Sequence, residues 1–440
     1  MPRPVRGWLW QLAALRRDFL GFLSDQARIH GDVVALTPVP TTRFVLVSDP
    51  ALISEILTTR ASEFTKSKQT RTMVGKFLGD GLVLSEGETH RCQRRRLAPA
   101  FNGGAVAALG PAIAAEATKW CDEALAKDGP FDFGSAMSDL TLSMIAMALF
   151  GGAAEGLGEL GAATRTFADA MAQRFNSMPW PGWLPTARNR RETHAIASLD
   201  ASLAKFRTED APVEGARPPL ASWLSEAVTR GDITPTEWRD QIATLLFAGH
   251  ETTAKVLAWL FHLLAWRPEL QADLVDELRG VTSPGETLTP AAIQGLPFLD
   301  AVLSECLRLY PPVWLFDRSP MAETELGGHK LTSRDAIYLS PYVTQRDPRW
   351  FADPLQFAPR RFLDGNVKNA PPFAYLPFGG GPRVCVGRAL ATVEVKLIAA
   401  TILARFRVEA VGGERTISPA PGATLGMARP LIVRLRRREI

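Results

Sequence analysis

The chain has 440 residues, of which 46% are hydrophobic and 22% are charged, and its formal net charge is +4. These values are ordinary for a globular protein with a substantial core. The mild basicity, with no basic face that alternates with aromatic residues, argues against a nucleic-acid-binding protein. The four cysteines are scattered and form no C-x-x-C pair, which argues against a disulfide framework or a zinc site and favours a reducing cytoplasm.

The first apolar stretch is GWLWQLAAL at residues 7–15, followed by Arg16 and Arg17. It is much shorter than the roughly 20 residues that a membrane-spanning helix needs, and it lacks the small-residue cleavage site of a signal peptide. We therefore expect a docked helix or loop here, with a membrane-surface contact as the less favoured alternative. We expect no transmembrane anchor.

Residues 33–48 alternate in polarity and carry β-branched side chains, which predicts a strand pair. The longest helical pattern follows later, at residues 234–266. Thr234 is its expected N-cap, Pro235 suits the first helical position, and Glu237 completes a capping box. Because this segment is apolar on most faces, we expect a helix buried through the centre of the protein.

The C-terminal third is less helical. Short strands such as AIYLS at residues 336–340 are expected among many prolines and glycines, a final helix is predicted over residues 386–405, and residues 408–440 read as strands and turns. No internal repeat, low-complexity linker or composition shift marks a domain boundary.

The sequence FGGGPRVCVG occupies residues 378–387 and places a cysteine in a glycine-rich loop. Glycine permits close approaches that other residues forbid. Cys385 comes immediately before the predicted final helix, and helix N-termini stabilise negative charge. Arg383 adds positive charge, so the loop favours a thiolate. An inert buried cysteine is the alternative for an isolated Cys residue.

The spacing F-x-x-G-x-R-x-C-x-G is matched by Phe378, Gly381, Arg383, Cys385 and Gly387. This string resembles the haem-binding loop of the cytochrome P-450 family. The resemblance implies a haem b cofactor with Cys385 as the thiolate ligand of its iron, and Phe378 packed on the proximal side of the ring. A thiolate ligand favours O–O cleavage.

The segment ECLR places Glu305 and Arg308 on one face of an apolar helix predicted over residues 298–309. A solvated surface pair is the ordinary alternative, but a pair buried on such a helix needs partners. The family's P-x-R-F segment is matched by Pro359, Arg361 and Phe362. By resemblance, Glu305, Arg308 and Arg361 form a structural salt-bridge triad that braces the haem-loop side of the fold.

The segment AGHETT lies in the middle of the long helix, where Gly249, Glu251 and Thr252 match the acid–alcohol pair of the family. By resemblance, Gly249 leaves room for dioxygen, and Glu251 and Thr252 relay protons to oxygen at the iron. The alternative is that Glu251 and Thr252 belong to a solvent-exposed stripe of the helix and that Gly249 only allows close packing. His250 is expected to be structural, and Thr253 to face packing.

The segment HRCQR places His90 and Arg94 one turn apart. The family sets this pair against a haem propionate, and arginine suits bidentate carboxylate binding. The resemblance implies that Arg383 and Arg318 complete the propionate clamp. A basic solvated face is the alternative.

The resemblance implies one mainly helical domain with small β-sheets, the cytochrome P-450 fold, with the haem between the long central helix and the Cys-loop helix. Its expected parts are a β-rich portion at about 30–50, a helical core at about 50–310, a Pro/Gly-rich segment with the haem loop at 311–387, and the final helix and C-terminal strands at 388–440. It resembles the soluble bacterial type, expected in the cytoplasm.

The implied function is a haem-thiolate monooxygenase that inserts one oxygen atom from dioxygen into an apolar small molecule, by hydroxylation or epoxidation. Electrons would come from a separate ferredoxin or flavodoxin-type donor with its reductase, steered to Arg383 and Arg388 and to other basic residues, Arg91, Arg95 and Arg96. A peroxide-driven peroxygenase and a non-catalytic haem sensor are the alternatives.

The substrate pocket is expected, by family position, to draw on residues 66–85, 170–190, 242–252, 312–316 and 423–426. Within it, Val313 to Phe316 are bulky and apolar. The stretch at 175–185 is expected to be a hydrophobic lid or, equally, a packed turn. A fatty acid, terpenoid or similar lipid-like molecule is the expected substrate.

Overall fold

The computed structural model describes residues 7–39, 42–126, 129–151, 157–175, 184–206, 219–282, 286–363, 365–412 and 415–438. The chain divides into two compact units. One, the sheet unit, comprises residues 1–71, 297–388 and 419–421; the other, the helical unit, comprises residues 72–296, 389–418 and 422–440. Neither unit is a continuous stretch of sequence, and the expected single domain stays a prediction.

The sheet unit is built on a five-stranded sheet in the order β1-β2-β8-β5-β3. Its strands are β1 (Val33–Val39), β2 (Thr42–Val47), β3 (Phe64–Thr65), β5 (Phe316–Pro320) and β8 (Ala336–Leu339). The β2–β8 pair is parallel and the other pairs are antiparallel. The strand pair predicted at 33–48 is therefore confirmed, and β8, from the C-terminal third, pairs with β2 beside it.

Further helices and short strands belong to the sheet unit. They are α1 (Trp8–Arg17), α2 (Phe19–His30), α3 (Pro50–Ser54), α13 (Pro297–Leu309), α14 (Pro341–Thr344), and the short strands β6 (Thr324–Leu326), β7 (His329–Leu331) and β10 (Pro419–Pro421). The core joins sheet residues such as Val45 and Leu339 to Ile53 of α3 and to Leu376, just before the cysteine loop. Burial of these aliphatic side chains fixes the surroundings of the loop.

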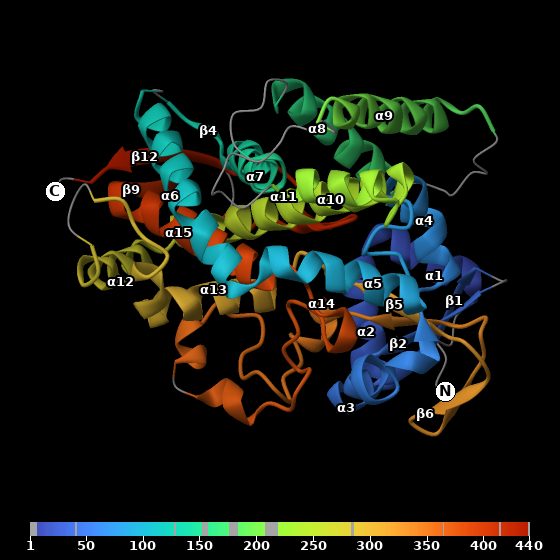
Figure 1. Ribbon diagram of the computed structural model, residues 1–440. Helices are drawn as coiled ribbons and strands as arrows, with labels where there is room; N and C mark the ends of the chain where they lie inside the picture. Colours follow the sequence, from blue (N-terminus) through green and yellow to red (C-terminus); the bar gives the residue numbers. More distant parts are fainter. Residues whose placement is uncertain are drawn as a thin grey trace. The chain divides into compact units, whose positions relative to one another are not determined.

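The helical unit contains most of the helices. They are α5 (Gly87–Leu97), α6 (Gly103–Leu125), α7 (Phe133–Phe150), α8 (Leu157–Phe175), α9 (Ala187–Ala204), α10 (Leu220–Thr229), α11 (Pro235–Ala265) and α12 (Pro268–Arg279), with α4 (Lys68–Leu78) and α15 (Arg388–Arg405) lying across the unit boundaries. A three-stranded sheet, β4 (Phe131–Asp132), β12 (Ile432–Arg437) and β9 (Phe406–Ala410), and strand β11 (Leu425–Met427) complete it. Figure 1 shows α8 and α9 side by side.

The helix predicted at 234–266 is confirmed as α11, which has 31 residues and is buried along most of its length. Thr234 is the N-cap, and its hydroxyl accepts the Glu237 N–H at 3.1 Å. The capping box is only half formed, because the Glu237 carboxylate pairs with Arg96 at 3.3 Å instead of reaching back. The indole N–H groups of Trp238 and Trp259 donate to the carbonyls of Ala221 and Leu425.

The final helix begins later than predicted. Residues 386 and 387 form a turn, and α15 starts at Arg388, so Cys385 does not immediately precede the helix. Among the described helices, α7 is long and apolar enough to cross a membrane, and half of its apolar window is buried. The bent pair formed by residues 87–101 and α6 passes the same test only if it is counted as one span.

Candidate functional site

The cysteine loop is held by a hydrogen bond within its own backbone and by close packing against Leu57 of the same unit. The Cys385 N–H donates to the Phe378 carbonyl at 3.0 Å. Gly379 and Gly381 have φ angles of +69° and +63°, which favour glycine. A Cβ on Gly381 would lie 1.7 Å from the Leu57 carbonyl oxygen, whereas one on Gly379 would meet nothing within 4 Å. Gly381 therefore allows the loop to pack against the backbone at Leu57, and the space beside Gly379 is open.

The four cysteines differ in their surroundings. Cys121 and Cys306 are buried, and burial raises the pKa of Cys121 to about 12 and raises that of Cys306 further. Cys92 is exposed, but its Sγ lies 3.4 Å from a carboxylate oxygen of Glu88. Cys385 is exposed and has the basic loop and the N-terminus of α15 beside it. Of the four, it is the one placed to act as a thiolate ligand.

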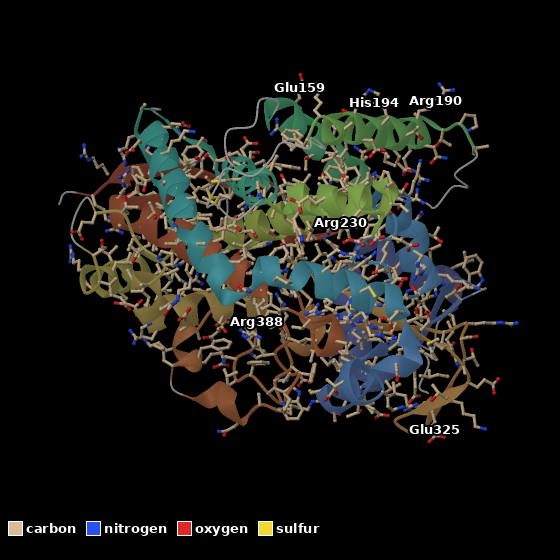
Figure 2. All side chains as sticks on the ribbon, viewed as in Figure 1. Glu159, Arg190, His194, Arg230, Glu325 and Arg388 are labelled. Atoms are coloured by element: carbon tan, nitrogen blue, oxygen red, sulfur yellow. The ribbon has the colours of Figure 1, made fainter. Side chains whose placement is uncertain are left out.

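The surroundings of Cys385 fit a haem iron. Arg383 ends a short 3-10 turn in the loop and is half-buried. Arg388, labelled in Figure 2, is exposed, and its guanidinium lies 5.7 Å from the centroid of the half-buried Phe378 ring. Gly387 is half-buried in the turn before α15. The accessible sulfur is a suitable ligand for haem iron, and the positive charge nearby favours its thiolate form. The open space at Gly379 leaves room for a flat macrocycle.

Glu305, Arg308 and Arg361 come together as one buried cluster in the sheet unit. Arg308 donates twice to the Glu305 carboxylate, at 2.7 and 2.9 Å, and Arg361 Nε donates to it at 3.0 Å. The backbone N–H of Ala358 adds a fourth bond at 2.9 Å. The Arg308 guanidinium also donates to three backbone carbonyls, those of Gln345, Pro354 and Gln356. The charges are therefore well satisfied despite their burial.

Gln345 connects this cluster to the cysteine loop, a role that no sequence pattern indicated. Its side-chain Nε2 donates to the carbonyls of Leu307 and Arg308 at 3.0 Å. Its Oε1 accepts the N–H of Leu376 at 2.9 Å, two residues before Phe378. Gln345 is fully buried. One side chain thus bonds both the last turn of α13 and the chain entering the loop.

The acid–alcohol segment lies on α11 in the helical unit. Thr252 is half-buried, and its hydroxyl donates to the Ala248 carbonyl at 2.6 Å. Thr253 is buried, as expected, and its hydroxyl donates to the Gly249 carbonyl at 2.8 Å. Residues 247–249 and 251–252 are only half-buried, whereas 241–246 are fully buried. The middle of α11 is therefore accessible on the face that carries Thr252.

Gly249 has a packing role that the sequence did not specify. A Cβ there would lie 2.8 Å from the Cγ1 and Cδ1 atoms of Ile145 on α7. The missing side chain lets α11 and α7 approach each other. Its predicted role in leaving room for dioxygen stays a prediction.

Glu251 lies in a small polar cluster of the helical unit. Its Oε1 is 3.3 Å from Lys255 Nζ and accepts the Thr424 hydroxyl at 3.1 Å. Its Oε2 lies 3.7 Å from Nε2 of His250, whose pKa burial lowers below its usual value. Burial and the negative charge of Glu251 raise the pKa of Asp169 on α8. The helical spacing of Glu251 and Lys255 could have predicted their pair; nothing local indicated Thr424.

The proposed propionate residues fall in both units. His90 is buried on α5 and Arg94 lies half-buried one turn later, in the helical unit. Arg318 is buried on β5 of the sheet unit, where its Nη1 donates to the Asp317 carbonyl at 2.7 Å. The structure thus brings the cysteine loop, Arg318 and the Glu305 cluster into one unit. It brings His90, Arg94 and the acid–alcohol segment into the other.

Comparison with known proteins identifies related sequences along the whole chain. Residues 1–433 match the sequence profile described as Cytochrome P450. Cyclooctatin synthase of Streptomyces melanosporofaciens is 34% identical, over 96% of this chain and 92% of its own length. Pentalenene oxygenase of Streptomyces avermitilis is 30% identical, over 99% of this chain and 96% of its own length.

Solved structures show the same fold. The retinoic acid-bound cyanobacterial CYP120A1 superposes with a TM-score of 0.86 at 25% identity, covering 99% of each chain. CYP175A1 from Thermus thermophilus superposes with a TM-score of 0.79 at 26% identity, covering 99% of this chain and 100% of the other. The predicted fold class, mainly helical with small sheets, is confirmed.

Proposed function

Because the chain belongs to the cytochrome P450 family, we propose that it is a haem-thiolate monooxygenase that inserts one oxygen atom from dioxygen into a terpenoid. The family uses haem b, and its relatives here include enzymes named as monooxygenase and oxygenase. The single observation that carries the assignment to this chain is the geometry of Cys385. It is an exposed sulfur in a glycine loop closed on Phe378, ahead of a helix N-terminus.

We assign the iron ligand to Cys385. When bound, the haem supplies the activation of dioxygen, and a thiolate ligand favours O–O cleavage. Arg383 and the N-terminus of α15 stabilise the negative charge of the sulfur. Phe378 and Gly387 lie at the two ends of the loop and shape the surface presented to the ring.

We assign proton handling to Thr252 and Glu251. The Thr252 hydroxyl, which donates to the Ala248 carbonyl at 2.6 Å, can rotate to donate its proton outward from the accessible face of α11. Lys255 and Thr424 both donate to Oε1 of Glu251 and fix the carboxylate, which leaves Oε2 as the oxygen that can exchange a proton. The acid–alcohol pair argues against a peroxide-driven peroxygenase, which would use a substrate carboxylate in its place, and against a haem sensor, which needs no proton relay.

We assign the haem propionates to His90, Arg94, Arg318 and Arg383. Arginine donors match carboxylates in geometry and charge. The burial of His90 and Arg318 favours short, poorly screened bonds to an anionic group.

The substrate class rests on the relatives and on apolar side chains. Two relatives have names that refer to the oxygenation of cyclooctat-9-en-7-ol and pentalenene. In this chain, Val313 to Phe316 form an apolar stretch, in which Trp314 is buried and Val313 is exposed. Residues 176–183, within the expected lid, lie outside the described residues. We favour a terpenoid over a fatty acid because of these two relatives, since the apolar stretch suits either class.

The electron donor is assigned as a separate ferredoxin or flavodoxin-type protein, and the location as the cytoplasm. The exposed Arg388 and the half-buried Arg383 suit an acidic donor. Arg91 and Arg96 are less suited, because they pair with Glu88 and Glu237.

Turnover with an electron-transfer pair and isotopically labelled dioxygen tests the proposal. A panel of cyclic terpenes is first screened by the shift of the haem absorption band, and the binders are then assayed. Incorporation of one labelled oxygen atom per product, dependent on the donor, is expected. Product formed with peroxide alone and not with dioxygen would instead identify a peroxygenase, and no product from any spectroscopically bound terpene would favour a sensor.

A further inference from the structure

The first seventeen residues carry an unusual concentration of positive charge. They contain Arg3, Arg6, Arg16 and Arg17 and no acidic residue, so this stretch alone carries +4, the formal net charge of the whole chain. Two of these arginines lie in the last turn of α1. The remainder of the chain is close to neutral overall, so the charge is local.

Helix α1 presents large apolar side chains to solvent. The exposed fractions of Trp8, Leu9 and Trp10 are 43%, 64% and 38%. Ala13, Arg16 and Arg17 are exposed as well. Leu9, Ala13 and Arg16 follow helical spacing and share one face, so the apolar first turn continues into a basic last turn.

The orientation of α1 is set by a polar contact on its other side. Gln11 is the buried residue of this helix. Its Oε1 accepts the Thr37 N–H of β1 at 2.9 Å, and its Nε2 donates to the Thr37 hydroxyl at 3.5 Å. The ring centroids of Trp10 and of Phe22 on α2 are 6.1 Å apart, so Trp10 packs within the unit, whereas Leu9 is the most exposed large apolar side chain of the helix. Here the amide faces the sheet unit and Leu9 faces out.

We propose that α1 is a docking surface for an anionic lipid bilayer. Tryptophan is favoured at the membrane–water interface, where its ring is apolar and its N–H is polar. Basic residues beside an apolar helix face are attracted to anionic headgroups. The proposed contact lies on the membrane without spanning it, because α1 has 10 residues and a spanning helix needs roughly 20.

The positive charge of α1 favours an anionic bilayer over a second copy of the chain as the partner of this surface. Two copies meeting through α1 would bring Arg16 and Arg17 of one copy close to those of the other, which electrostatic repulsion opposes. An anionic bilayer offers the opposite charge and an apolar interior for Leu9. The inference does not depend on the proposed function, since it uses no residue of the haem or proton machinery.

Vesicle flotation with the full-length haem-loaded protein tests the proposal. Binding is measured to vesicles of phosphatidylcholine alone and of phosphatidylcholine mixed with phosphatidylglycerol, at low and high salt. We expect binding to the mixed vesicles that weakens as salt is raised. No binding to the mixed vesicles, or equal binding to both kinds, would overturn the proposal.

Two double variants and one control locate the surface. Replacing both arginines (R16Q/R17Q) should weaken binding on the order of 25-fold, from about 5-fold for each charge. The W8S/L9S variant should lose binding while the haem spectrum is unchanged. Leu355→Ser, at a leucine that is 76% exposed in the same unit, is the matched control and should bind like the parent.

Two outcomes of the variant series would contradict the assignment to α1. One is full binding by W8S/L9S. The other is an equal loss in Leu355→Ser, which would indicate a general effect of exposed apolar residues. Sedimentation velocity without lipid completes the series: a dimer that is lost in W8S/L9S would assign this face to a second copy and overturn the bilayer proposal.

Discussion

Glu305 and Arg308 lie one turn apart on α13 and form a bidentate ion pair in which both side chains are fully buried. Arg361 approaches the same carboxylate from a short helical turn more than fifty residues later, and its side chain is 9% exposed. The carboxylate thus joins α13 to the segment before the cysteine loop, and Gln345 continues the connection to Leu376.

Replacing Glu305 with alanine should strongly destabilise the sheet unit. The change leaves the buried Arg308 without its counter-charge, and breaking a buried pair costs about 3–5 kcal/mol. We expect little haem-loaded protein, measured as haem absorbance per mole of purified chain. Glu325→Ala, at an exposed glutamate labelled in Figure 2, is the control and should behave like the parent. Equal haem content in both variants would contradict the structural role of the cluster.

A buried carboxyl on α15 should make stability depend on pH. Glu394 lies in an apolar cavity between α15 and residues such as Ile113 and Ile145, and its Oε1 has no hydrogen-bond partner. Burial raises its pKa from 4.5 to about 8. Between these values the folded chain holds a proton that the unfolded chain releases. The contribution of Glu394 to the free energy of unfolding is therefore fully present below about pH 4.5 and is lost as pH rises through about 8.

The slope of this effect is at most about 1.4 kcal/mol per pH unit. Denaturant unfolding of the parent and of Glu394→Gln between pH 5 and 9 measures it. The parent should lose stability relative to the variant as pH rises. His262, whose pKa burial lowers to about 4, titrates equally in both proteins and cancels in the difference. Parallel stability curves would show that Glu394 is ionised in the fold.

Replacing Thr252 with alanine should uncouple electron consumption from product formation. The variant loses the hydroxyl proposed to donate a proton, so reduced oxygen should leave as peroxide. Product per reduced nicotinamide should fall several-fold while peroxide rises, and Thr252→Ser should restore coupling. Thr253→Ala is matched in chemistry and also removes a bond to a backbone carbonyl, but from a buried side chain. Equal uncoupling in both variants would remove Thr252 from the relay.

Reversing the charge of Arg388 should slow reduction by an acidic donor. Steering by exposed charges weakens as salt screens them, so the parent rate should fall with ionic strength. Stopped-flow reduction with a competent ferredoxin measures both effects. Arg230→Glu makes the same change in net charge at an exposed arginine after α10 and is the control (Figure 2). A parent rate independent of salt would argue against electrostatic docking.

Local patterns predicted much of the fold and the candidate site. The periodicity and cap of α11, the early strand pair and the burial of Glu305 with Arg308 all follow from neighbouring residues. The contacts that were missed are tertiary. Thr424 bonds Glu251 across 173 residues, and Gln345 bonds Leu376 across 31 residues. No local rule specifies such pairs.

The glycines show the same limit. The glycines of the cysteine loop indicated a close approach, which the family resemblance assigned to the haem, and no local pattern indicated the protein atoms that two of the glycines accommodate. Gly381 accommodates the Leu57 carbonyl, and Gly249 accommodates Ile145, whereas Gly379 borders open space. The start of α15 was also placed two residues early, because the turn at 386–387 continues the apolar pattern of the helix.

The carbon monoxide difference spectrum of the reduced protein, recorded for Cys385→Ala and for Cys92→Ser, tests the central claim most directly. Both residues are exposed cysteines, and only Cys385 lies in the glycine loop. The account predicts that Cys92→Ser keeps the strongly red-shifted band of thiolate-ligated haem and that Cys385→Ala loses it. A red-shifted band that persists in Cys385→Ala would show that another residue holds the iron and would contradict the account.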